Sequence, residues 1–134
     1  MATGMFENGV RAIMGADIDL VNDDISALLI DTDLYTPDLL NDVDESDIPE
    51  ASIVARQELT GKTLDGTVFR ANNTVFTSVT GANVGAVLLS LNSDTFDTSA
   101  LIFCMDNAPE LPIVPDGTDI TIDWDIGANG IFKL

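Results

Sequence analysis

The chain has 134 residues, carries a formal net charge of −18 and is 46% hydrophobic. This length is typical of a single domain, and the apolar content is well above that of a disordered acidic tail. So negative a protein would repel a phosphate backbone, which argues against nucleic acid as a partner. The first ten residues lack the basic start and apolar stretch of a signal peptide, and the apolar runs are too short for a membrane span.

Residues 1–15 are expected to form a short helical arm. Thr3 is a candidate N-cap and Gly15 a candidate stop, although Gly9 weakens the helix. A helix this short is marginal alone, so its apolar stripe has to pack on something. Two alternatives remain open: the stripe docks on a partner, or it covers an open end of the chain's own sheet. The stripe consists of Met5, Phe6, Val10, Ile13 and Met14.

The next part of the chain, residues 17–50, is an acidic segment. Twelve of the 23 carboxylates lie between Asp17 and Glu50, and no Lys or Arg interrupts them. Such a surface is solvated, bound to cations or matched by a basic partner. Within the segment, Thr36 is expected to cap one helical turn that begins at Pro37.

Calcium is a weak ligand hypothesis for the acidic segment. Two runs of carboxylates at alternate positions present hard oxygen donors of the kind that Ca²⁺ takes. Both runs lack the central glycine and the final glutamate of an EF-hand loop. The favoured interpretation is therefore a solvated face that keeps an apolar sheet protein from aggregating, with no cofactor. The candidate ligands are Asp17, Asp19, Asp23, Asp24, Asp42 and Asp44.

From Ile25 onward, turn-forming residues separate short apolar runs, a pattern typical of short strands. Apolar runs bounded by Gly, Asn, Asp or Ser occupy residues 25–30, 53–59, 67–71, 74–79, 84–91, 100–105, 120–124 and 131–134. The clearest alternation places Ile120, Ile122 and Trp124 on one face, where Trp124 is expected in the core rather than at an interface. Residues 1–134 are therefore expected to form a single, mainly β domain. Its architecture is an antiparallel β-sandwich or a jelly-roll-like small barrel with a short N-terminal helix.

Catalytic residues are not expected. The chain has no His, which removes Ser-His and Cys-His nucleophiles and the commonest zinc ligand. The run Gly61-Lys62-Thr63 resembles the end of a phosphate-binding loop, but the earlier Gly of that motif is missing. A carboxylate pair, as in glycosidases, cannot be singled out among so many acids. Cys104 is the only cysteine and lies in an apolar run, so it is interpreted as a buried thiol.

The C-terminal stretch carries a resemblance to a known family. Pro115-Asp-Gly-Thr-Asp-Ile-Thr-Ile-Asp-Trp-Asp-Ile-Gly-Ala-Asn-Gly-Ile-Phe-Lys-Leu134 resembles the ending of small structural proteins encoded by tailed bacteriophages. The similarity continues upstream in a consistent order and covers nearly the whole chain. It includes Ala27-Leu-Leu-Ile-Asp-Thr-Asp-Leu-Tyr-Thr-Pro37, Asp47-Ile-Pro49, Leu59-Thr-Gly-Lys-Thr63 and Thr74-Val-Phe-Thr-Ser-Val-Thr-Gly81.

This resemblance implies a virion protein that is made in the host cytoplasm and is not an enzyme. The expected role is capsid decoration, in which the protein binds the outer shell and reinforces contacts between coat subunits. Its expected partners are the major capsid protein and further copies of itself, with a trimer favoured. The apolar stripe of residues 5–14 would supply the interface, and the acidic segment would face water. Two alternatives remain open: a tail, baseplate or fibre-associated structural protein, and a Ca²⁺- or carbohydrate-binding module for host attachment.

Overall fold

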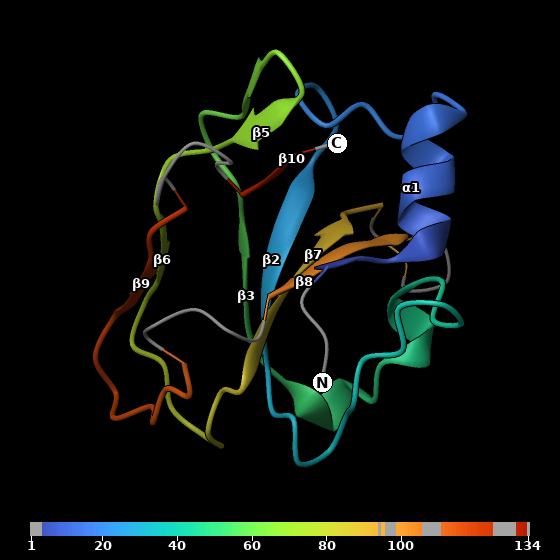
Figure 1. Ribbon diagram of the computed structural model, residues 1–134. Helices are drawn as coiled ribbons and strands as arrows, with labels where there is room; N and C mark the ends of the chain where they lie inside the picture. The colour runs from blue at the N-terminus through green and yellow to red at the C-terminus, as the bar shows by residue number, and fades with distance from the viewer. Residues whose placement is uncertain (1–3, 94, 96–98, 106–110, 125–130, 134) are drawn as a thin grey trace.

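A five-stranded antiparallel sheet forms the centre of the protein, as the computed structural model in Figure 1 shows. The model describes residues 4–93, 95, 99–105, 111–124 and 131–133. The strand order is β1-β8-β7-β2-β3. These strands are β1 (Gly4–Met5), β2 (Ile25–Ile30), β3 (Ile53–Glu58), β7 (Ala86–Leu91) and β8 (Leu101–Met105).

Two small antiparallel sheets complete the β structure. One has the order β10-β5-β4, from β4 (Thr63–Asp65), β5 (Val68–Arg70) and β10 (Phe132–Lys133). The other pairs β6 (Thr74–Phe76) with β9 (Ile120–Ile122). In total, 37% of the protein is strand and 12% is helical. The predicted fold class is confirmed: the protein is mainly β and antiparallel, consistent with a small sandwich that carries a short N-terminal helix.

The central strands are buried on both faces, which explains their unbroken apolar sequences. Every residue of β2 is buried, and its side chains alternate between two cores. The larger core lies between the central sheet and the small sheets. There, Phe132 packs against Phe69 and Phe103, with ring centroids 5.2 and 5.4 Å apart. Trp124 is 2% exposed and its indole N–H donates to Thr74 Oγ1 at 2.7 Å, so its predicted core position is confirmed.

The helix α1 (Glu7–Met14) lies against β8 at one edge of the central sheet (Figure 1). It ends at the predicted stop, Gly15, but its N-cap is Phe6 rather than Thr3, so the predicted start was wrong. Thr3 itself lies outside the described residues. The helix begins later than predicted because residues 4–5 form the strand β1, which is extended and pairs with β8. No helix in the described parts of the chain is long and apolar enough to cross a membrane.

Residues 31–52 of the chain cover the second face of the central sheet. Tyr35 and Ile48 are buried there against Leu28, Leu88 and other residues of the smaller core. The thiol of Cys104 is buried in this core, as predicted. The segment also contains two 3-10 turns, η1 (Glu45–Asp47) and η2 (Glu50–Ser52). The predicted helical turn lies slightly later in the chain and is capped by Asp38 rather than Thr36: the backbone N–H of Asp42 donates to the carbonyl of Asp38 at 2.9 Å.

Candidate docking surface

The predicted interface stripe lies mostly inside the protein's own fold. Met5 belongs to β1 and pairs with Phe103 of β8, and Phe6 is fully buried. Val10 and Ile13 are partly buried. Met14 is 80% exposed, which makes it the part of the stripe that is free to meet another molecule. The structure thus places the stripe on the β1–β8 side of the central sheet, with one exposed methionine at its end.

Gly9 allows this close packing of helix on sheet. A Cβ at Gly9 would stand 2.3 Å from the carbonyl oxygen of Leu101 and 2.9 Å from the Cα of Ile102. Both contacts are with backbone, which cannot move aside as a side chain can. The residue that weakens the helix by its propensity is therefore the residue that lets the helix approach β8.

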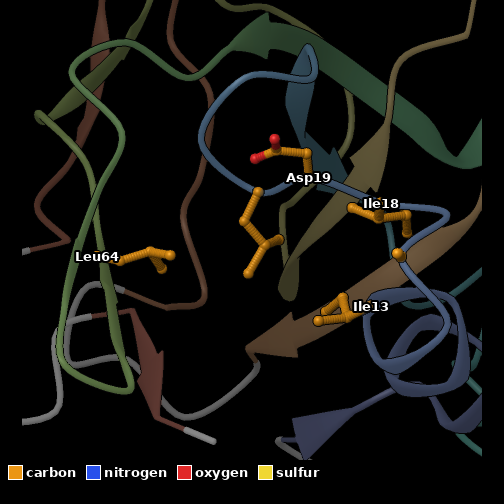
Figure 2. Close-up of a pocket in the computed structure, with 6 residues that line it drawn as sticks. Ile13, Ile18, Asp19 and Leu64 are labelled. Carbon is orange, nitrogen blue, oxygen red and sulfur yellow. The ribbon is translucent and has the colours of Figure 1, made fainter.

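A hollow of about 340 Å³ lies beside the C-terminal end of α1. Figure 2 shows Ile13 and Ile18 on one side of it and Leu64 on the opposite side. Ile13 comes from α1, and Leu64 comes from β4. The loop after the helix provides the remaining lining, which consists of Ala16, Ile18, Asp19 and Leu20.

Aliphatic side chains make up most of this hollow. Ile18 and Leu20 are only 5% and 7% exposed, so they are already part of the core. Leu64 is 55% exposed and lies on β4, an edge strand of its sheet. Edge strands usually carry charged residues outward, because an exposed apolar edge invites association. We therefore identify the hollow with Leu64, together with Met14, which follows the lining residue Ile13 in the chain, as the candidate docking surface.

Carboxylates lie in and beside the candidate docking surface. Asp19 is part of the lining and Asp17 is exposed in the same loop, whereas the 78% exposed side chain of Asp65 follows Leu64 and points to the other face of β4. Hydrogen bonds from the side chain and the backbone N–H of Asn22 hold the pKa of Asp19 below its usual value, and Lys62 adds a smaller effect. Asp19 is therefore ionised at neutral pH, and the hollow combines an apolar wall with a fixed negative charge.

The loop that carries Asp19 occurs twice in the chain. Residues 19–23 and 38–42 read Asp-Leu-Val-Asn-Asp and Asp-Leu-Leu-Asn-Asp. In each, the first carboxylate accepts from the backbone N–H groups two and three residues later and from the Asn side chain. The last carboxylate accepts from the backbone N–H of the first residue, at 2.9 Å in one copy and 3.0 Å in the other. Sequence reasoning missed this repeat, which is visible as two five-residue segments identical at four positions.

These loops account for half of the six candidate calcium ligands. Asp19, Asp23 and Asp42 bind their own loops, and Asp44 caps η1 by accepting from the Ser46 backbone N–H. Asp17 and Asp24 are exposed. Within the part of the chain that the structure describes, no three His, Cys, Asp or Glu side chains form a group that could hold a metal ion. The six candidates are thus not brought together, and a Ca²⁺ site stays a prediction.

The acidic segment also contains buried acids. Glu45 is 2% exposed; both of its carboxylate oxygens accept from Arg56, and one also accepts from Ser90 Oγ at 2.8 Å. Asp31 is 7% exposed. The expectation of a water-facing acidic surface therefore needs correction at these two residues. Glu45 ties residues 31–52 to β3 and β7, because Arg56 and Ser90 lie on those strands.

Sequence reasoning missed Leu64, which forms one wall of the hollow. The available signal was a lone apolar residue between Thr63 and Asp65, just before the Asp65-Gly66 turn. Its partners in the hollow lie more than forty positions earlier in the chain, so no local pattern connects them. No protein-family model and no curated protein matches this sequence.

Proposed function

We propose that this protein is a structural component of a tailed-phage virion that decorates the outer shell of the capsid. It binds between coat subunits and reinforces their contacts. The observation that carries the proposal is a compact apolar docking surface on an otherwise strongly acidic β-sandwich. The resemblance of the sequence to small phage structural proteins supports the virion setting.

The docking surface suits a reinforcing role because it is small and rigidly supported. Ile18 and Leu20 at its base belong to the same core as the central strands. A patch of this size stabilises one contact only modestly, but many copies on one particle act together. The proposed partners are the coat protein and further copies of this chain, arranged as a closed oligomer in which a trimer is favoured.

The distribution of charge supports the same arrangement. Exposed carboxylates of the acidic segment would face solvent, and their repulsion would keep particles apart. The docking surface would face the shell, where the carboxylate of Asp19 would require a basic complement on the coat protein. Charge would thus orient each copy, and the apolar contact would hold it.

The test begins with particles of the encoding phage. Mass spectrometry should detect the protein in purified virions, and particle reconstruction should locate it at seams between coat subunits. Particles that lack the protein should rebind the purified protein in co-sedimentation. The Leu64→Gln and Met14→Ser variants should rebind weakly, and the control Leu40→Gln should rebind normally, because Leu40 is 73% exposed on the acidic segment. Absence from virions would overturn the proposal, and density on the tail would support the tail-associated alternative instead.

A further inference from the structure

We infer that the hollow between α1 and β4 receives a basic side chain from an extended, basic-apolar segment of a partner protein. The aliphatic stem of a Lys or Arg would lie against Ile13, Ile18 and Leu64, and its cation would meet the carboxylate of Asp19. This occupant rests on the proposed function, since it names the chemistry of the coat-protein segment that would bind. The hollow itself is defined by residues of this chain alone.

The size and lining of the hollow favour a side chain over a larger ligand. Its volume of about 340 Å³ lies at the lower end of the range of about 300–1,000 Å³ that small-molecule pockets occupy. Five of its six lining residues are aliphatic. Lys and Arg combine a long aliphatic stem with a charged end, so they can cover apolar surface while their charge stays near water.

The charges around the hollow select a cation. Asp19 is ionised within the lining, and Asp17 is exposed in the same loop. The chain's own Lys62 has only a small effect on Asp19, and both Lys62 and Arg70 have contacts of their own. Lys62 Nζ donates to the backbone carbonyl of Asp23, and Arg70 Nε lies 3.8 Å from Asp65 Oδ2. A purely apolar ligand would desolvate Asp19 without replacing its lost hydration.

The position of Leu64 on an edge strand favours an extended partner. β4 is the last strand in the order β10-β5-β4, and all three of its residues are exposed. An edge strand offers backbone donors and acceptors to an added strand, whose alternate side chains can then enter pockets along it. A segment paired with β4 could therefore place one of its side chains over the hollow.

A second copy of this chain suits the hollow less well. Each copy carries a net charge of −18, and the Asp19 carboxylates of the two copies would face one another in a symmetric contact through the hollow. Like charges in such a contact are destabilising, whereas a basic segment would gain from the same carboxylate.

The experiment is a titration of the full-length, ¹⁵N-labelled protein, followed by amide chemical shifts. The probe is the acetylated, amidated pentapeptide Val-Lys-Val-Lys-Val, and its matched control carries Glu in place of Lys. The Lys peptide should shift amides at residues 13–20 and 63–65, and added NaCl should weaken its binding. Leu64→Gln should weaken binding about fivefold or more, since it removes apolar contact area. Leu40→Gln should leave binding unchanged.

A second variant tests the charge. Asp19→Asn keeps a side-chain oxygen for the loop and removes the negative charge, so it should weaken the Lys peptide while the amide spectrum stays folded. Equal binding of the Glu peptide, or no shifts around the hollow, would overturn the inference. A dimer in native mass spectrometry that Leu64→Gln dissociates would also overturn it, because the occupant would then be a second copy.

The peptide titration and the virion experiments can fail independently of one another. If the Lys peptide binds but the protein is absent from virions, the site stands and the capsid role fails. If the protein decorates particles but the Lys peptide does not bind, the capsid role stands and the basic occupant is wrong.

Discussion

Gly9 of α1 lies so close to Leu101 of β8 that an added Cβ would stand 2.3 Å from the Leu101 carbonyl oxygen. Helix propensity alone favours Gly9→Ala by about 1 kcal/mol. The clash with backbone should outweigh that gain, and we expect Gly9→Ala to lower the free energy of unfolding by about 1–3 kcal/mol. Urea denaturation measures the change. Arg11→Ala is the control, because it removes only an exposed ion pair with Glu7 and should change stability by less than about 0.5 kcal/mol. A stabilised Gly9→Ala protein would contradict the packing described here.

The buried ion pair of Glu45 and Arg56 should respond asymmetrically to mutation. Arg56→Met leaves the buried carboxylate of Glu45 without its guanidinium and should lower the free energy of unfolding by about 3 kcal/mol or more. Glu45→Gln leaves a guanidinium whose side chain is 33% exposed and can be hydrated, so its effect should be smaller. Chemical denaturation of both variants gives the ranking. The reverse order would show that the carboxylate reaches water more readily than its burial indicates.

Acid should destabilise the two repeated loops. Side-chain hydrogen bonds from Asn22 and Asn41 lower the pKa values of Asp19 and Asp38 from the ordinary value of 3.8. Because these folded-state pKa values lie below the unfolded ones, the contribution to stability is full above the unfolded value and disappears as pH falls through the folded value. We expect Asn22→Ala and Asn41→Ala to move the acid-unfolding midpoint to higher pH, as followed by circular dichroism. The exposed Asn83→Ala serves as the control, and equal midpoints in all three variants would contradict the prediction.

The single tyrosine offers a direct measurement at alkaline pH. Burial, and then the hydrogen bond that the Tyr35 hydroxyl donates to Asp42, raise the pKa of Tyr35 far above its ordinary value of 10.0. The stability contributed by the neutral phenol is complete below the unfolded pKa and is lost as pH rises above it. We expect the phenolate absorbance to appear only together with loss of the near-ultraviolet circular dichroism signal. A phenolate that forms at about pH 10 while the protein stays folded would rule out the buried arrangement.

Leu64 should matter for binding and not for folding. Its side chain is 55% exposed on an edge strand, so Leu64→Gln should change the free energy of unfolding by less than about 0.5 kcal/mol. Leu28→Ala, in the fully buried strand β2, should lower it by about 2–5 kcal/mol. Thermal melts of both variants provide the comparison. A large loss of stability in Leu64→Gln would make this residue part of the core and would weaken its assignment to a docking surface.

The sequence by itself determined the elements whose signal is local. The apolar run of β2 matched its predicted bounds, since a strand buried on both faces needs apolar residues throughout. The alternation around Ile122 predicted the burial of Trp124, and Gly15 predicted the end of α1. In each case, the residues that carry the signal are neighbours in the chain.

The tertiary structure alone decided which acids face water and where an apolar surface remains open. In the sequence, Glu45 cannot be distinguished from its exposed acidic neighbours; its burial depends on Arg56, which β3 places beside it. In the sequence, Leu64 cannot be distinguished from an ordinary strand residue; its place in the wall of the hollow depends on Ile13, which the end of α1 positions on the opposite side. Burial and charge pairing depend on distances between segments that are remote in sequence, and only the folded chain sets those distances.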